Sequence, residues 1–166
     1  MKEEIINGIK YRLDEENLTA EVIRKGEYID CIIIPEAVVF NELTYRVTSI
    51  GKYAFYGCES LTAITIPNSV TIIEDSAFHD CKKLSSITIP ESVEIIGDSA
   101  FAYCESLKVI AIPNSVKYIG DWAFSSCSSL AVVTFQGAAP WMKGIGLGDN
   151  WHFGSPAKIT IVPTVL

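Results

Sequence analysis

The sequence predicts a solenoid, a fold in which short coils of chain stack on one another around a continuous core. Three observations predict it. Ile-Pro pairs end at Pro67, Pro90 and Pro113, so the same dipeptide recurs every 23 positions. Residues 62–84 and 85–107 are identical at 14 of 23 positions. A Phe-x-x-Cys-x-x-Leu frame recurs with the same period. Such self-similarity is typical of repeat proteins, whose units bury their apolar faces against one another.

Each repeat unit predicts two short strands followed by a tight turn. The first segment, for example Ile64–Pro67, alternates apolar and small polar residues and ends at a proline, which has no N–H for a sheet ladder. The second segment, Ser-Val-x-x-Ile, is a briefer strand that ends in Gly-Asp in two units. The Ala-Phe-x-x-Cys-x-x-Leu segment has apolar residues at i, i+3 and i+6, which predicts one or two tight helical or 3₁₀ turns.

Stacking of the units predicts ladders of equivalent side chains in the core. The largest rungs are phenylalanines, and the others are aliphatic residues from the two strands and from the end of the turn. The predicted ladders are Phe55, Phe78, Phe101 and Phe124; Ile64, Ile87, Ile110 and Val133; Ile66, Ile89, Ile112 and Phe135; Val47, Val70, Val93 and Val116; and Leu61, Leu84, Leu107 and Leu130.

Residues 1–46 predict an N-terminal β cap. An open solenoid exposes an apolar cross-section and an unpaired strand, so its ends need covering. Ile9–Ile23 predicts two strands, in which apolar and polar residues alternate, around an Asp-Glu-Glu-Asn turn. Ala37–Val47 predicts a second hairpin, inserted into the first coil, with its turn near Asn41-Glu42.

The remaining chain divides into the repeats, residues 47–136, and a C-terminal cap, residues 137–166. The period breaks after Gln136, where a Gly- and Trp-rich loop begins. Lys158–Pro163 then predicts one more strand that closes the stack. We expect the 166 residues to form one domain, because a chain of this length can bury a sizeable core.

Composition narrows the classes of partner. The net charge is −7, and the lysines and arginines are scattered, whereas proteins that bind nucleic acid carry a clustered basic excess. No apolar run approaches the ~20 residues that span a bilayer, so we expect no membrane insertion. The N-terminus has no apolar signal core.

The cysteines are expected to be structural. Cys58, Cys81, Cys104 and Cys127 recur once per unit, so stacking at ~4.8 Å per strand spreads their sulfurs over ~14 Å. A tetrahedral zinc site needs all four within ~2.3 Å of one point. Small buried wall residues are therefore the favoured interpretation, and a disulfide between neighbours is the alternative. The fifth, Cys31, is expected to be a partly exposed structural thiol outside the ladder.

These features resemble the BspA-like leucine-rich repeats, a class common on bacterial surface and secreted proteins. The residues that carry the resemblance are Ile64–Leu84, ITIPNSVTIIEDSAFHDCKKL, and its copies. The N-terminal TAEV, IIIP and YRVTSIGKYAF are similar to the lead-in of such chains. The resemblance covers roughly residues 9–163. It implies a right-handed leucine-rich-repeat solenoid of the α/β type, with mostly short parallel strands and β-structure at both ends.

The resemblance also implies what the protein does. It implies a cell-surface or extracellular location and a non-enzymatic adhesion or protein-interaction role. The family motif carries no catalytic residues, so no catalytic, cofactor or metal site is carried over. Nothing pairs His79 or His152 with a nucleophile, and the glycines of residues 144–148 lack the strand–helix setting of a phosphate loop.

Three surfaces are candidates for binding a partner. The first is the outward face of the strands, whose side chains are small and uncharged. The second is a ridge of aromatic residues at the turn corners, and the third is the pair of cap tryptophans, which would stack on carbohydrate. The candidate residues are Thr65, Thr88, Ala111 and Thr134 for the first; Tyr103 and Trp122, beside Tyr53, Tyr56 and His79, for the second; and Trp141 and Trp151 for the third.

The favoured hypothesis is a protein-interaction or adhesion module whose partner is a host extracellular or bacterial surface protein. The alternative is a carbohydrate-binding or enzymatic role that uses the Trp-rich C-terminal loop. A structural spacer in a larger surface protein is a third hypothesis, favoured if no face carries an apolar or aromatic patch.

Overall fold

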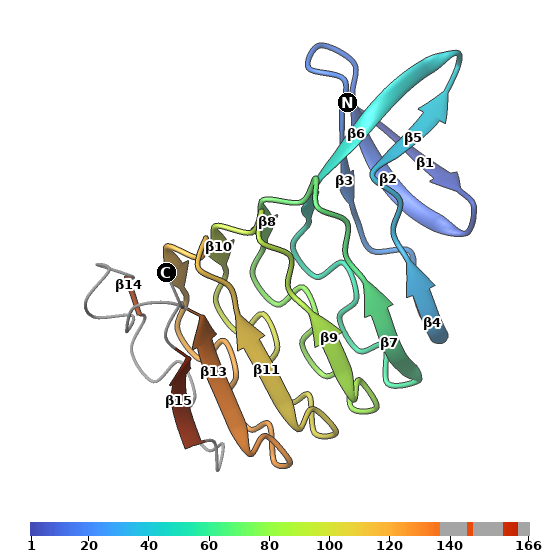
Figure 1. Cartoon of the computed structure of the whole chain (residues 1–166). Coiled ribbons are helices and arrows are strands. Elements are labelled where there is room, and N and C mark those ends of the chain that lie inside the picture. The colour runs from blue at the N-terminus through green and yellow to red at the C-terminus, as the bar shows by residue number, and fades with distance from the viewer. Residues whose placement is uncertain (137–145, 148–157, 163–166) are drawn as a thin grey trace.

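The computed structural model describes residues 1–136, 146–147 and 158–162, which form a β-solenoid of stacked coils (Figure 1). The predicted solenoid is therefore confirmed. No helix occurs among these residues, and thus none that is long and apolar enough to cross a membrane.

Each coil contributes one strand to each of two parallel ladders. The long strands lie side by side and form the first ladder, which consists of two hydrogen-bonded sheets, β4-β7-β9 and β11-β13-β15, with β9 next to β11. Their bounds are β4 (Asp30–Ile33), β7 (Leu61–Thr65), β9 (Ser86–Thr88), β11 (Val109–Ile112), β13 (Val132–Gln136) and β15 (Lys158–Val162). The short strands form the second: β6 (Leu43–Ile50), β8 (Ile72–Ile73), β10 (Ile95–Ile96), β12 (Tyr118–Ile119) and β14 (Gly146–Leu147).

The strand register between neighbouring coils matches the 23-residue repeat. Ile64 of β7 lies opposite Ile87 of β9, and Ile110 of β11 lies opposite Val133 of β13. Because the members of each pair are separated by one full repeat, equivalent side chains stack directly above one another. The predicted ladders are thus confirmed, and every one of their members is buried.

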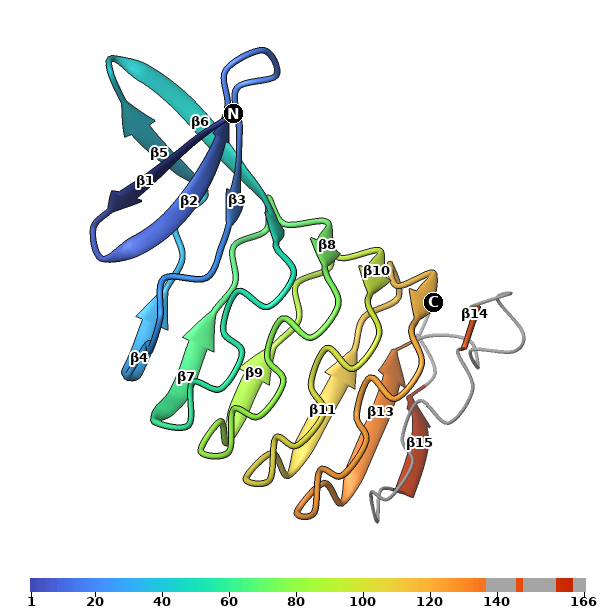
Figure 2. The same cartoon turned by 180° about the vertical axis from the view of Figure 1, so that it is seen from behind.

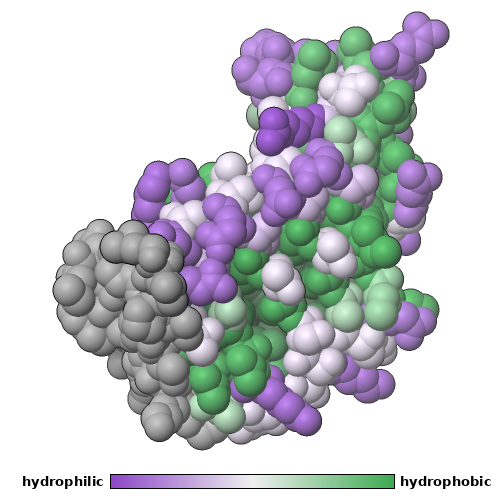
Figure 3. All heavy atoms as spheres, viewed as in Figure 1, coloured by the Kyte–Doolittle hydropathy of each residue, from purple (hydrophilic) through white to green (hydrophobic). Residues whose placement is uncertain are grey.

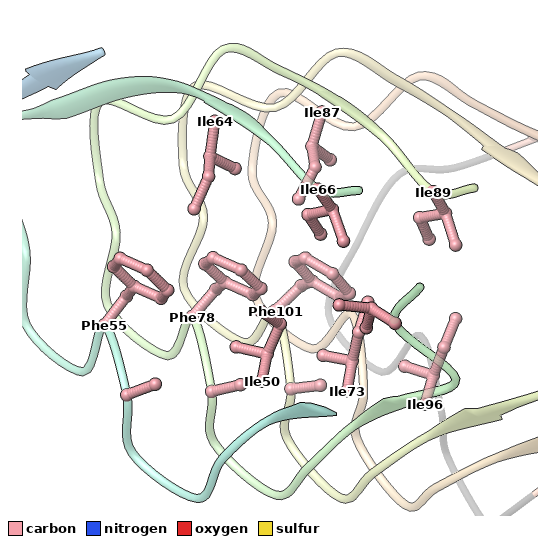
Figure 4. Close-up of a cluster of buried hydrophobic side chains, with 14 of the residues drawn as sticks. Ile50, Phe55, Ile64, Ile66, Ile73, Phe78, Ile87, Ile89, Ile96 and Phe101 are labelled. Carbon is pink, nitrogen blue, oxygen red and sulfur yellow. The ribbon is translucent and has the colours of Figure 1, made fainter. Parts of the chain in front are cut away.

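The phenylalanine ladder fills the space between the two strand ladders. The rings of Phe55, Phe78, Phe101 and Phe124 stack with centroids 5.0, 5.1 and 5.2 Å apart and with interplanar angles of at most 5°. Figure 4 shows Phe55, Phe78 and Phe101 between isoleucines of the long strands on one side and isoleucines of the short strands on the other.

The turns are not the helical or 3₁₀ turns that the i, i+3, i+6 spacing predicts. Bonds of the i→i−3 type occur, as from Cys58 N to Phe55 O (3.1 Å), but they alternate with bonds to the next coil. Phe55 N donates to Ala77 O (2.7 Å) and Gly57 N donates to His79 O (2.9 Å). A helix bonds its amides within its own segment beyond the first turn, so this sharing between coils is not helical. Figure 2 shows the turns of successive coils side by side as open loops.

The Gly-Asp turns bring successive coils into close contact. The amide of Asp98 donates to the Asp75 carboxylate (3.0 Å), and the amide of Asp121 donates to the Asp98 carboxylate (2.9 Å). A Cβ on Gly97 would lie 2.6 Å from the Asp75 backbone nitrogen, and one on Gly120 would lie 2.5 Å from that of Asp98. Glycine therefore allows the backbones to approach closely enough for each aspartate to bond the next.

The N-terminal cap is a meander joined to the second ladder. The two strands predicted in Ile9–Ile23 are β2 (Ile9–Asp14) and β3 (Thr19–Val22), and β3 runs parallel to β6. The predicted hairpin is formed by β5 (Ala37–Phe40) and β6, with left-handed Asn41 and Glu42 at its turn. A further strand, β1 (Lys2–Ile6), pairs with β2 and was not predicted.

Two strands lie in the predicted C-terminal cap. β15 runs parallel to β13, as the closing strand was expected to do. β14 falls inside the segment expected to be a loop, and it pairs with β12.

We expect Phe101→Ala to lower the free energy of unfolding by about 3–5 kcal/mol, because it removes a fully buried ring from the middle of the stack. Urea denaturation followed by circular dichroism measures this change. Ser126→Ala, at an outward turn position, is the control. A loss of less than about 1 kcal/mol in Phe101→Ala would contradict the assigned core.

Candidate functional site

The outer face of the first ladder is flat and carries small side chains. Thr65 lies opposite Thr88, and both are exposed. Ala111 is exposed and lies opposite Thr134, which is half-buried. These four predicted residues therefore share one outward column. The column offers little of the Tyr, Trp and Arg content that marks strongly contributing interface residues.

The outward column begins with a residue that the sequence analysis did not single out. Ile33 of β4 lies opposite Thr65, and its side chain is 74% exposed. Cys31 begins the neighbouring column, opposite Ala63, and is also exposed. The first strand of the face is thus more apolar than the strands after it. Extending the repeat alignment back to the Ile-Pro at Pro35 would have identified Ile33.

A ridge of aromatic rings runs along the turn corners, and we define it as Tyr53, Tyr56, His79 and Tyr103. The centroids of Tyr53 and Tyr56 are 5.7 Å apart, edge to face. Tyr56 stacks on His79 at 4.9 Å, and His79 contacts Tyr103 at 5.2 Å. The rings therefore form one continuous surface across three coils. Tyr103 lies in this surface, whereas Trp122, assigned to the same ridge from the sequence, makes no ring contact with these four residues among those that the structure describes.

Several bulky residues at the corners have a left-handed backbone. The φ angles are 60° at Tyr53, 60° at Tyr103 and 55° at Trp122. Equivalent units place Ser76 and Ser99 in the column of Tyr53 and Trp122. A left-handed φ is uncommon outside glycine and is least favourable for large side chains. The three aromatic residues are nevertheless 43%, 46% and 52% exposed, so core packing does not account for them.

Basic side chains extend the ridge. The Arg24 guanidinium lies over the Tyr56 ring at 5.4 Å, and the Lys52 ammonium lies over the Tyr53 ring at 5.6 Å. Beside Tyr56 is a hollow of about 390 Å³ lined by Arg24, Gly26, Glu27, Tyr56, Gly57, Glu59 and Ser60. Cation–π contacts of this kind hold the cationic groups against the aromatic surface.

His79 lies half-buried between two tyrosines. Its Nδ1 is buried and has no hydrogen-bond partner within the part of the chain that the structure describes. Burial lowers the pKa of His79, since the charged imidazolium loses hydration, and Asp80 opposes this effect. The ring therefore favours its neutral form. No acid or base is paired with His79 among the residues that the structure describes, which leaves it as part of the stack.

The cap tryptophans, Trp141 and Trp151, lie outside the described residues, and so does His152. Trp122 is described, at an exposed turn corner.

The cysteine ladder is built by thiol–carbonyl hydrogen bonds. Cys81 Sγ donates to Phe55 O (3.1 Å), Cys104 Sγ to Phe78 O (3.2 Å) and Cys127 Sγ to Phe101 O (3.1 Å). Each of these carbonyls also accepts a backbone amide of its own coil, so the thiol adds a second hydrogen bond from the next coil, a role that the sequence does not reveal. All five thiols are unoxidised, so the alternative of a disulfide between neighbours is not realised. Over the described residues, no group of three metal-binding side chains is found.

Burial raises the pKa of the ladder thiols. It raises that of Cys58 above its ordinary value and those of Cys81 and Cys104 well above it, because the thiolate loses its hydration. The thiolate is the nucleophilic form. These cysteines are therefore suited to packing and not to catalysis.

The sequence matches the family model described as "BspA type Leucine rich repeat region (6 copies)" over residues 28–140. No curated protein matches the chain.

Solved leucine-rich-repeat structures resemble it along almost its whole length. A Treponema pallidum leucine-rich-repeat protein is 26% identical, with a TM-score of 0.64 over 98% of this chain and 84% of that one. A Bacteroides ovatus leucine-rich-repeat protein is 25% identical, with a TM-score of 0.54 over 97% of this chain. A leucine-rich cell-surface protein of Faecalibacterium prausnitzii is 23% identical, with a TM-score of 0.61 over 99% of this chain. The chain spans 59% of the B. ovatus protein and 55% of the F. prausnitzii protein.

We expect stability to fall at alkaline pH because of the thiol ladder. Thiols in the unfolded chain ionise near pH ~8.5, whereas the buried thiols stay protonated. Above that pH the unfolded state therefore binds fewer protons, and the free energy of unfolding decreases as pH rises. The buried Tyr11, whose pKa burial also raises, adds to the decrease above pH ~10.

Urea midpoints measured from about pH 7.5 to about pH 10 would show this decrease. Cys104→Ala should make it shallower, whatever its effect on stability at neutral pH. Cys31→Ala, at the exposed thiol outside the ladder, is the control. An equal slope for Cys104→Ala and the wild type would contradict the assignment of the slope to the ladder.

Proposed function

Because the chain belongs to the BspA-type leucine-rich-repeat family, we propose that it is a non-enzymatic protein-interaction module of a bacterial cell-surface or secreted protein. Its binding surface is the aromatic ridge together with Trp122. A single observation carries this choice of surface. Bulky aromatic residues occupy left-handed turn positions where other units carry serine, and they remain exposed.

The chemistry of the ridge favours a protein partner. Tyr, Trp and Arg dominate the residues that contribute most to protein interfaces, because they bury large areas and also donate hydrogen bonds. The ridge combines Tyr53, Tyr56 and Tyr103 with the Arg24 guanidinium. Stacked side chains are also held in place before binding, which lowers the entropy lost on association.

The geometry of the ridge is less suited to carbohydrate. A sugar stacks on an open ring face. In the ridge, His79 covers one side of Tyr56 and Arg24 lies over its ring. Tyr56 and Tyr103 both contact the His79 ring. These contacts leave the faces of the Tyr56 ring less open to a sugar.

We expect the double variant Tyr103→Ser, Trp122→Ser to weaken binding to a protein partner at least about tenfold, as the loss of strongly contributing aromatic residues does. Serine occupies equivalent positions at Ser126 and at Ser76 and Ser99, so the fold tolerates it. The measurement is surface plasmon resonance against a panel of host extracellular-matrix and serum proteins and bacterial surface proteins.

Thr65→Glu combined with Thr88→Glu is the matched control on the other candidate surface. It should leave binding unchanged, and urea denaturation should show that both variants are folded. Binding lost only in the threonine variant would place the site on the strand face. Failure of the wild type to bind any protein of the panel would instead favour the structural spacer.

A further inference from the structure

The first strand of the long-strand ladder has a free edge. β4 pairs in parallel with β7 on one side, and no described strand pairs with it on the other. β7, by contrast, pairs with β4 on one side and with β9 on the other, and β9 in turn lies next to β11. The N-terminal cap continues the second ladder through β3 and β6 and leaves β4 at the end of the first (Figure 1).

The pairing of β4 with β7 determines which backbone groups of β4 point toward the free edge. Ile34 N donates to Thr65 O of β7 (3.1 Å). Successive residues of a strand direct their amides to opposite sides, so Ile32 also faces β7. The N–H and C=O groups of Cys31 and Ile33 therefore point away from the sheet. In the following coil the equivalent residues, Ala63 and Thr65, direct theirs toward β4.

The side chains beside this edge are apolar and exposed. Ile33 is 74% exposed and Ile29 is 57% exposed. Ile32 faces the core but is only partly buried, because it stands at the end of its ladder. A hollow of about 340 Å³ adjoins them; Ile9, Tyr28, Ile29, Ile32 and Ile33 give it apolar walls, and Asn7, Lys25 and Glu27 add polar groups to its lining. Figure 3 shows hydrophobic residues, in green, along the β4 side of the molecule.

We propose that two copies of this protein associate through β4, with their strands antiparallel about a twofold axis at Ile32. In this register Cys31 of one copy lies opposite Ile33 of the other. Both residues direct N–H and C=O groups outward, so each of the two pairs exchanges two hydrogen bonds. The β4-β7-β9 sheets of the two copies then join into one sheet. This association does not depend on the aromatic ridge.

The ends of the strand restrict the pairing to this register. Asp30, at one end, has a left-handed φ of 58°, and the β4–β7 register shifts between Asp30 and Cys31. Pro35, at the other end, has no N–H to donate. Cys31 and Ile33 are the two outward residues between these limits. An antiparallel copy presents the same two residues in reverse order, so it satisfies all the outward groups at once.

A second copy also suits the side chains of the edge. The twofold axis places the exposed Ile33 and Cys31 of one copy against Cys31 and Ile33 of the other, apolar against apolar. An isologous contact of this kind closes on itself and does not lead to longer assemblies. The strand is short, so the interface belongs to the small, transient class. The dimer is therefore expected to be weak and concentration-dependent.

Sedimentation velocity under reducing conditions tests the proposal, over concentrations from about 10 µM to about 1 mM, where small interfaces associate. We expect a reversible shift from monomer to dimer. Ile33→Lys should weaken association at least about tenfold, because lysine at a strand edge opposes pairing. Ile33 is exposed, so its replacement should leave the urea midpoint unchanged. Thr88→Lys, in the same column but away from the edge, is the control and should dimerise like the wild type.

Amide hydrogen exchange measured by NMR checks the register. The amides of Cys31 and Ile33 should become protected as concentration rises, whereas the Ile34 amide, bonded within the monomer, should be protected throughout. A protein that stays monomeric over the whole range would overturn the proposal. So would a dimer that Ile33→Lys leaves intact, or one that protects amides elsewhere and not those of Cys31 and Ile33.

Discussion

The structure depends on the sharing of backbone amides between neighbouring coils. Within each turn, alternate N–H groups bond inside the coil and to the next coil, as Cys58 and Phe55 do. This sharing fixes each coil directly above the last, so identical side chains meet identical side chains. The flat stacking of Phe78 on Phe101 and the donation from Cys104 to Phe78 O both follow from it. A coil by itself would leave half of its turn amides without partners.

The same constraint confines variation to the outward columns. Inward positions must repeat, because each packs against its own equivalent in the coils before and after it. An outward position meets solvent, so the side chain there can change from one coil to the next. The column that holds Ser76 and Ser99 also holds Tyr53 and Trp122. The residues proposed to recognise a partner therefore lie at positions where the repeat units differ. The residues that build the scaffold lie at positions where the units are the same.

The sequence predicts most of the fold, because a single repeat period constrains every ladder at once. It predicts the two strand ladders, the buried columns and the Asn41-Glu42 hairpin. It fails where a residue's partner lies in another coil. The i, i+3, i+6 spacing of the turn predicts a helix, because the local pattern gives no sign that the Phe55 amide bonds to Ala77 O in the next coil. β1 and the short β14 are defined by pairing alone. The aromatic ridge could be anticipated from its columns, but the contact of Arg24 with Tyr56 could not.

The uniform junction between coils has a consequence for the gene. The Phe55–Phe78, Phe78–Phe101 and Phe101–Phe124 contacts are nearly the same, with centroids 5.0, 5.1 and 5.2 Å apart. Unequal recombination that duplicates or deletes one whole repeat unit would therefore recreate a junction of the same geometry and leave both ends of the stack unchanged. Such an event would change the length of the chain by a whole unit and keep the reading frame. The continuity of the aromatic ridge, which spans particular coils, would be what such an event alters.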